Sequence, residues 1–282
     1  MDEDGDLPEG FLIILVLLPF LELFRLWLIL GNTSFTIDLL LEAVSNSIVT
    51  ITLLISTVFH YFKDSLWSLK RGLSTRTAWY GYPFLTHAVV HAGGGHLYNN
   101  VRAYNILLLV DIGFKGGFTF LSNYLSVNSF WIERVGENGT SMHLLTSRKT
   151  ESTEFIQTIV LATILGGSGH LILSKDHWMD AKGASGVCAA YCAIVIRELP
   201  DITALIVFFG FWFWLFRRIT SCEDDDADAH EIHFVGFLCG FTLRGALFQQ
   251  LLISVGIVLV MFVFRFGWNR RSHASRISSL PI

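Results

Sequence analysis

The chain has 282 residues, of which 52% are hydrophobic and only 16% are charged, and its formal net charge is −4. A composition this apolar and this poor in charge excludes an ordinary soluble domain. The sequence has no basic patch that would indicate a nucleic-acid partner. The four cysteines show neither metal-binding nor disulfide spacing. The composition therefore predicts an integral membrane protein that contacts the lipid bilayer.

Apolar runs separated by polar stretches recur along the chain, and a helix that crosses a bilayer needs about 20 apolar residues. We identify such runs at residues 11–30, 37–62, 96–113, 154–173, 183–196, 202–216, 230–247 and 251–267. The sequence therefore predicts an all-α, multi-pass membrane protein with a six-helix transmembrane core over residues 37–247. Residues 1–36 would add an N-terminal tail and an extra transmembrane helix, and residues 248–282 an extra C-terminal helix with an arginine-rich tail.

Polar segments separate these runs. Residues 63–86 mix tryptophan and tyrosine with lysine and arginine, which is typical of a membrane interface. Residues 114–152 are expected to form a connecting loop with some interfacial helix. The acidic block at 223–228 marks another loop, because it cannot enter hydrocarbon. Within the first run, Glu22 and Arg25 are three residues apart on one helix face, so we expect them to form an ion pair.

Three histidines and two asparagines lie together at residues 86–100, next to the third apolar run. Consecutive glycines between them make one continuous helix unfavourable, because each glycine costs roughly 1 kcal/mol against alanine. A new helix is expected to begin near His96, so His96 and Asn100 share a face and can donate hydrogen bonds to one point. This pair is a candidate oxyanion hole. For His87 and His91 we favour a structural role that ties the loop to the helices.

A second motif reads Gly183-Ala184-Ser185-Gly186, where a polar loop enters an apolar run. Ser185 is expected near a helix N-terminus, whose free N–H groups favour a developing negative oxygen. Taken alone, such a motif is more often a packing motif than a nucleophile. One side of this helix is nearly flat, because small residues recur there at helical spacing, at Gly186, Ala189, Ala190 and Ala193.

A third motif places His233 three and seven residues before Gly236 and Gly240. The imidazole therefore shares a helix face with a strip of glycines, which another helix can approach closely. Packing this strip on the flat face of the Ser185 helix would bring Ser185 and His233 into contact. Because a serine hydroxyl needs an adjacent base, the three motifs together supply a nucleophile, a base and oxyanion donors.

Taken together, the motifs resemble the signature of the rhomboid family of intramembrane serine proteases. The family pattern is His-x4-His-x3-Asn, then Gly-x-Ser-Gly, then His-x-x-Gly-x-x-x-Gly, and the chain has the three in this order within residues 37–247. The matching residues are His91, His96 and Asn100, then Gly183, Ser185 and Gly186, then His233, Gly236 and Gly240.

The resemblance implies a Ser-His dyad with neither cofactor nor metal. Ser185 would attack a peptide carbonyl and His233 would take and return the proton. His96, Asn100 and the Ser185 backbone N–H would stabilise the oxyanion. The resemblance also implies single-span membrane proteins as substrates and an active site on the extracytoplasmic side. Structural roles near the site are implied for His87, His91, Gly183, Gly186, Gly236 and Gly240.

Three positions differ from the common family pattern. Ala189 stands where an aromatic residue often packs on the catalytic imidazole, and Lys182 stands where glycine is common. Ile232 stands where alanine is usual. None of these differences removes a reacting group.

Two other functions stay open on the sequence. An inactive rhomboid-like protein that binds membrane clients would have the same fold, although such relatives typically lose the serine or the histidine. A metal- or haem-binding membrane protein is the alternative of a different class, because histidines cluster at His87, His91, His96, His230 and His233. However, His230 and His233 are three positions apart, whereas the two histidines of a zincin motif are four positions apart.

Overall fold

The computed structural model describes residues 7–30, 37–62, 72–91, 93–127, 152–174, 181–199, 201–220 and 230–278. Over these ranges the chain is mostly helical, and its extended pairing is limited to an isolated antiparallel bridge between Leu73 and Ala181. The predicted all-α class is therefore confirmed for the described part of the chain. The acidic block at residues 223–228 lies outside it.

Apart from two short helices within residues 78–86, which were expected to be an interfacial loop, the helices correspond to the predicted apolar runs, and residues 37–62 form a bent pair. In chain order they are α1 (Phe11–Leu30), α2 (Ile37–Asn46), α3 (Ile48–Tyr61), η2 (Ala78–Tyr80), α4 (Pro83–Thr86), α5 (Gly94–Val127), α7 (Ser152–Leu173), α8 (Ser185–Arg197), α9 (Asp201–Thr220), α10 (His230–Thr242) and α11 (Leu247–Ser278). α5 begins within the glycine run, as predicted. It continues as far as Val127, through the first part of the predicted connecting segment 114–152.

Three described helices are long and apolar enough to cross a membrane: 18 residues at Phe11–Leu28, 21 at Thr153–Leu173 and 19 at Leu247–Arg265. Leu40–Asn46 and Ile48–Tyr61 add a fourth if the two parts, bent by 67°, form one span. α8 and α10 have 13 residues each, which corresponds to ~20 Å of helix against a hydrocarbon core of ~30 Å. The described residues are thus compatible with a multi-pass membrane protein, and the six-helix core stays a prediction.

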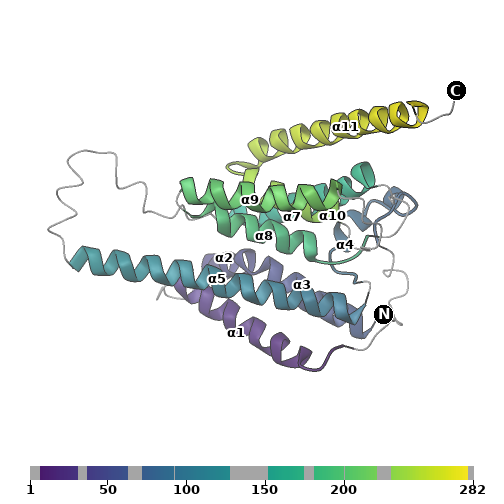
Figure 1. Cartoon of the computed structure of the whole chain (residues 1–282). Coiled ribbons are helices and arrows are strands. Elements are labelled where there is room, and N and C mark those ends of the chain that lie inside the picture. The colour runs from purple at the N-terminus through teal and green to yellow at the C-terminus, as the bar shows by residue number, and fades with distance from the viewer. Residues whose placement is uncertain are drawn as a thin grey trace, which may run out of the picture.

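The helices form two groups, with α1, α2, α3 and α5 in one and α7, α8, α9 and α10 in the other (Figure 1). α11 lies along the outer side of the second group, where it packs on α7. The short helix α4 and its neighbouring loops lie at the end of the molecule where α5 and α8 begin. This end brings together the loop that precedes α5 and the turn that precedes α8.

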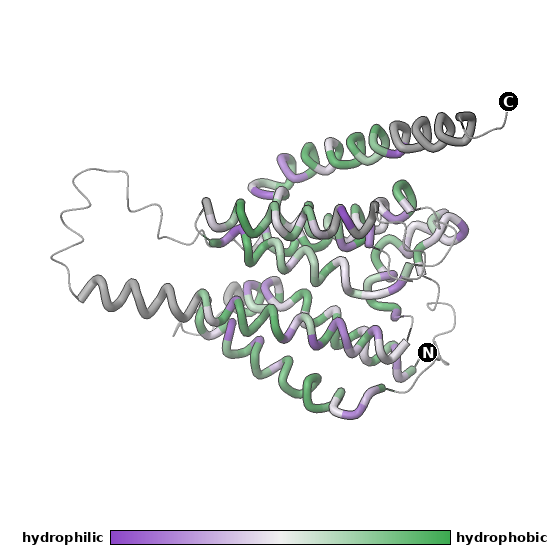
Figure 2. Tube along the Cα trace, in the orientation of Figure 1, coloured by the Kyte–Doolittle hydropathy of each residue, from purple (hydrophilic) through white to green (hydrophobic). Residues whose placement is uncertain are grey.

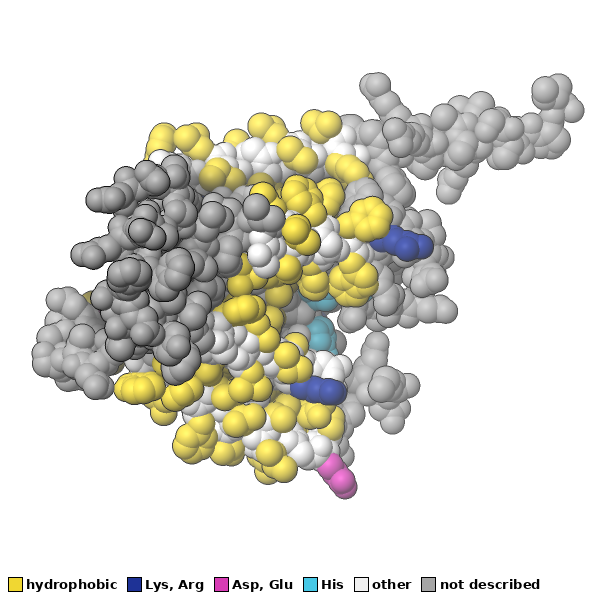
Figure 3. Space-filling model, turned by 60° about the vertical axis from the view of Figure 1, so that its left-hand side comes forward, with side chains coloured by type: hydrophobic (Ala, Val, Ile, Leu, Met, Phe, Trp, Pro, Cys, Tyr) yellow, Lys and Arg dark blue, Asp and Glu magenta, His cyan; other side chains and the backbone are white. Residues whose placement is uncertain are grey.

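α8 lies inside the bundle, while α1, α9 and α11 lie at its surface. α8 packs on α5, α7, α9 and α10, and most of its side chains are buried, as expected of a helix that is apolar on all sides. The outer helices expose large apolar residues, among them Ile13 (74%), Ile206 (68%) and Val263 (73%). Hydrophobic positions dominate these helices along the trace (Figure 2) and on the surface (Figure 3). Exposed apolar surface of this extent is compatible with a protein surrounded by lipid.

Candidate active site

The turn before α8 is held by backbone hydrogen bonds to the segment that precedes α5. Ala181 and Leu73 exchange two of them, at 2.8 and 2.9 Å, and the Gly183 N–H donates to the His87 carbonyl oxygen at 2.8 Å. Gly183 has a φ of +124°, in a region that favours glycine. The turn leads directly into α8, whose first residue is the half-buried Ser185. Ser185 therefore lies at a helix N-terminus, as its sequence context predicts.

Two side chains of α5 approach this turn. A Cβ built on Gly183 would lie 2.7 Å from Cε1 and 2.8 Å from Nε2 of His96, and 3.5 Å from Nδ2 of Asn100. Glycine is therefore required at position 183 for this close approach as well as for its backbone conformation. His96 and Asn100, one helical turn apart, come together two residues before Ser185. The structure thus brings both predicted oxyanion donors to the turn that carries the predicted nucleophile.

His91 connects the two sides of this turn. Its Nε2 accepts a hydrogen bond from the Ala184 N–H at 3.3 Å and pairs with Asn100 Nδ2 at 2.9 Å. Because a backbone N–H only donates, Nε2 must be the unprotonated nitrogen. Burial, and to a smaller extent the nearby His96, lower the pKa of His91 to about 3. A neutral His91 therefore orients Asn100 and the backbone before Ser185, a role that sequence spacing across the glycine run did not reveal.

His87 has the contacts of a structural residue. It is 1% exposed, and its Nδ1 pairs with the Pro83 carbonyl oxygen at 3.0 Å, one turn earlier. Its Cε1 would lie 3.3 Å from a Cβ at Gly167 of α7. Burial lowers the pKa of His87 to about 4, so the imidazole is neutral near pH 7. His87 thereby joins α4, α7 and the turn before Ser185.

α8 and α10 meet through backbone contacts that we call the glycine seam, formed by Gly186, Ala190, Gly236 and Gly240. A Cβ at Gly236 would lie 3.3 Å from the Gly186 Cα, and one at Gly240 only 2.8 Å from the Ala190 Cα, with the carbonyl oxygens closer still. Because Gly186 meets Gly236 and Ala190 meets Gly240, the two helices run in the same direction. The small-residue faces predicted from the sequence do face each other.

The seam places the candidate nucleophile and base at the same end of two adjoining helices. Ser185 immediately precedes Gly186, and His233 lies one turn before Gly236. Both side chains are half-buried, and His233 also contacts the His230 ring, with 6.0 Å between ring centroids. Histidine side chains are visible in a recess of the face shown in Figure 3.

Ile232, one of the departures from the family pattern, packs into the space that two glycines leave. Its Cγ2 would lie 3.3 Å from a Cβ at Gly166 of α7 and closer to one at Gly186 of α8. The larger side chain is therefore accommodated, because both neighbouring helices have glycine at the contact. Ala189, where an aromatic residue is missing, borders an apolar cluster that includes Phe234 and Trp212, whose ring centroids lie 5.7 Å apart.

The histidines do not assemble a metal site within the described ranges. No group of three or more histidine, cysteine, aspartate or glutamate side chains among these residues is arranged to hold a metal ion. His91 uses its Nε2 for hydrogen bonds inside the protein rather than presenting it to a ligand. Within these ranges, therefore, no three-donor metal site supports the metal-binding alternative.

Comparison with known proteins adds no functional assignment. No family model, curated protein or solved structure matches the chain. The functional argument consequently rests on the geometry around Gly183 and along the glycine seam.

Proposed function

We propose that the chain is an intramembrane serine endopeptidase of the rhomboid type, with Ser185 as nucleophile and His233 as its base. The observation that carries the proposal is the convergence at Gly183, where His96 and Asn100 reach the turn that begins the Ser185 helix. The glycine seam supports it, because close contact between α8 and α10 is what a base on α10 requires. Three motifs from distant parts of the chain thus serve one reaction.

In the proposed reaction, the Ser185 hydroxyl attacks the carbonyl carbon of a peptide bond while His233 takes its proton. Hydrogen bonds from His96, Asn100 and the Ser185 N–H stabilise the oxyanion. His233 then gives the proton to the leaving amine as the peptide bond breaks. A water molecule hydrolyses the acyl-enzyme by the same sequence of proton transfers, which frees Ser185.

His91 supports the oxyanion site in this mechanism without touching the substrate. The Asn100 amide group carries two N–H bonds, so the one directed at His91 Nε2 leaves the second for the substrate oxygen. Fixing Asn100 before the substrate arrives avoids reorganisation during the reaction, which is the basis of electrostatic stabilisation in such sites.

The proposed substrates are the transmembrane segments of single-span membrane proteins. The outer helices expose apolar surface suited to lipid, so a membrane-embedded segment reaches the protein laterally. The carbonyl groups of an intact helix are already hydrogen-bonded, so the substrate must unwind locally before attack. We place the site toward the extracytoplasmic face, as the family resemblance implies.

The decisive experiment combines covalent labelling with substrate cleavage. Wild-type protein in detergent or liposomes is expected to react with a fluorophosphonate probe and to cleave a model transmembrane substrate. Ser185→Ala should abolish labelling and lower cleavage by about 10⁴-fold or more. The matched control is Ser254→Ala on α11, because the Ser254 hydroxyl bonds only to the Gln250 carbonyl oxygen of its own helix.

Three results would overturn the proposal. Cleavage that persists in Ser185→Ala would exclude Ser185 as the nucleophile. Activity that is lost to a metal chelator would indicate a metalloenzyme. Wild-type protein that binds the transmembrane substrate without labelling or cleavage would favour the client-binding alternative.

A further inference from the structure

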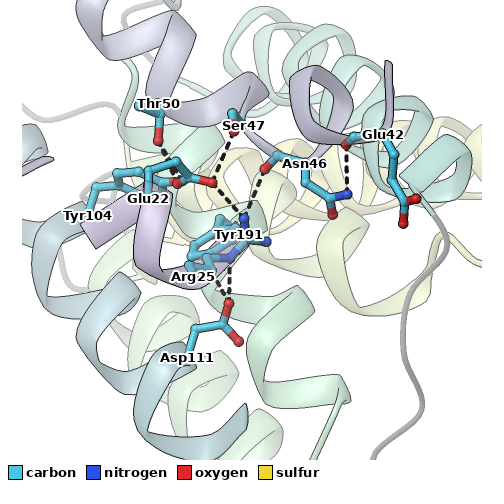
Figure 4. A network of polar contacts seen from close by, with 9 residues as sticks. All are labelled: Glu22, Arg25, Glu42, Asn46, Ser47, Thr50, Tyr104, Asp111 and Tyr191. Atoms are coloured by element: carbon cyan, nitrogen blue, oxygen red, sulfur yellow. Dashed lines mark hydrogen bonds and ion pairs between the residues drawn. The ribbon is translucent and has the colours of Figure 1, made fainter. Parts of the chain in front are cut away.

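A buried polar network links α1 to α5 and α8, two of the three helices that carry the candidate site (Figure 4). Arg25 of α1 donates from Nε to Asp111 of α5 at 2.7 Å and from Nη1 to Glu22 at 2.8 Å. All three side chains are nearly inaccessible to solvent. The sequence predicted the pair of Glu22 and Arg25, but it did not predict the contact with Asp111, which lies 86 positions away. We call these residues, with Thr50, Tyr104 and Tyr191, the Arg25 network.

The Arg25 guanidinium contacts four other helices. Besides Asp111 of α5, it donates to the Asn46 carbonyl oxygen at the end of α2, at 3.1 Å. It also lies over two aromatic rings, 5.3 Å from the Tyr191 centroid in α8 and 5.7 Å from the Phe155 centroid in α7. An N-terminal helix that served only as a membrane anchor would need none of these contacts.

α1 also supplies partners for the break between α2 and α3. The two helices meet at 67°, and a break in an apolar span frees backbone groups that must be bonded inside the protein. Arg25 bonds to the Asn46 carbonyl oxygen, and Glu22 accepts from the hydroxyls of Ser47 at 3.1 Å and Thr50 at 2.7 Å. The bent pair and α1 therefore form one unit.

The same network joins the helix of the candidate nucleophile to the helix of the candidate oxyanion donors. The Tyr191 hydroxyl donates to Asp111 Oδ2 at 2.8 Å, the oxygen that also accepts from Arg25. Tyr191 lies ~9 Å along α8 from Ser185. Asp111 lies on α5, whose first two turns carry His96 and Asn100. The Tyr191 ring packs on Tyr104 of α5, with centroids 5.0 Å apart. This bond therefore sets the position of α8 against α5.

We propose that Arg25 and Tyr191 are positioning residues for the reaction, an inference that rests on the proposed function. Through Asp111 they hold the Ser185 helix at the distance from His96 and Asn100 that the oxyanion site requires. It follows that α1, outside the six-helix core, is part of the catalytic unit.

The test measures kcat and KM separately for Tyr191→Phe in the full chain, with a model transmembrane substrate in liposomes. This change removes one hydroxyl and keeps the ring. We expect kcat to fall by about tenfold, the scale of one hydrogen bond to a charged group, with KM unchanged. Thr158→Val is the matched control, because it removes a buried hydroxyl whose bond goes to the Leu243 carbonyl oxygen and not to Arg25, Asp111 or Tyr191. Its kcat should equal that of the wild type.

Two further measurements separate positioning from a loss of stability. The loss of kcat in the Tyr191→Phe/Asn100→Ala double variant should be smaller than the product of the two single-variant losses. This is expected because both substitutions act through the same oxyanion site. Arg25→Lys, which keeps the charge, should retain more kcat than Arg25→Met. A wild-type kcat in Tyr191→Phe, an equal loss in Thr158→Val, or fully multiplicative effects would each overturn the inference. Wild-type protein that neither labels nor cleaves would overturn the proposed function instead.

Discussion

α8 is held on two of its sides by opposite means. Toward α10 the contact is the glycine seam, in which Gly236 and Gly240 lie directly against the backbone of Gly186 and Ala190. Toward α5 and α1 the contact is the Arg25 network, made of charged and hydroxyl groups. Both contacts are buried among apolar helices, where water does not compete for hydrogen bonds and association relies on close packing and polar pairing.

The comparison shows two ways in which one helix bundle fixes the positions of neighbouring helices. A seam of small residues sets the distance between helices by steric exclusion, so it tolerates almost no added volume. A buried ionic network sets position by direction and charge, so it tolerates volume changes but not the loss of a partner. In the proposed enzyme, the seam would control the distance between the nucleophile and the base. The network would control the position of the oxyanion donors.

The largest effect is expected from removing the central cation of the network. Arg25→Met leaves Glu22 and Asp111 buried without their counterion, which should lower the free energy of unfolding by about 3–5 kcal/mol. Denaturant titration in detergent micelles measures this change. The triple variant that adds Glu22→Gln and Asp111→Asn removes the excess charge and should recover most of the loss. A loss below about 1 kcal/mol for Arg25→Met would show that the network is not a stabilising element.

A smaller loss of stability is expected in the seam. Gly240→Ala places a methyl group against the Ala190 backbone, which cannot move aside as a side chain would, so the helices must separate. We expect a loss of about 1–3 kcal/mol and slower cleavage, because Ser185 and His233 move apart. Gly256→Ala on α11 is the matched control, since a Cβ there has no atom within 4 Å. Equal stability of the two variants would contradict the steric role of the seam.

The last effect comes from pH, which acts gradually at the end of the α5 and α8 contact where His91 lies. The folded protein lowers the pKa of His91 from 6.5 to about 3, because the imidazole is buried. Between these values the unfolded chain binds a proton that the folded protein does not. The stabilisation is therefore complete above pH 6.5 and is lost as the pH falls toward 3, with a slope of up to ~1.4 kcal/mol per pH unit.

Unfolding measured from pH 7 to pH 5 tests this linkage. His91→Gln should reduce the slope by about one proton, while the contribution of His87 remains. Gly240→Ala, which alters only the seam, should keep the wild-type slope. An unchanged slope in His91→Gln would show that His91 is not held neutral in the folded protein.

The helical class and the order of the helices were predictable from the sequence, because apolar runs long enough for a membrane helix are visible in composition alone. The lengths of the helices were less predictable. α8 and α10 are short helices, and α5 extends past its apolar run to Val127. Helix ends depend on the hydrogen bonds that the neighbouring segments offer, which composition does not record.

The candidate site was predictable where the spacing places residues on one helix face. His96 and Asn100 fall on one face at i and i+4, and the small residues of the seam recur at helical spacing. The bonds from His91 to Ala184 and Asn100 were not predictable, because they depend on the path of the loop between α4 and α5. The packing of Ile232 between Gly166 and Gly186 was equally unpredictable, because Gly166 belongs to none of the three motifs.

The sequence by itself therefore determined the all-α class, the apolar helices suited to a membrane, the motif residues and the faces on which they lie. These follow from local composition and helical periodicity. The tertiary structure alone decided that His96 and Asn100 meet the turn at Gly183, that α8 and α10 touch through their backbones, and that Arg25 joins Asp111. Such contacts join residues far apart in the chain, and only the folded arrangement of the helices brings them within bonding distance.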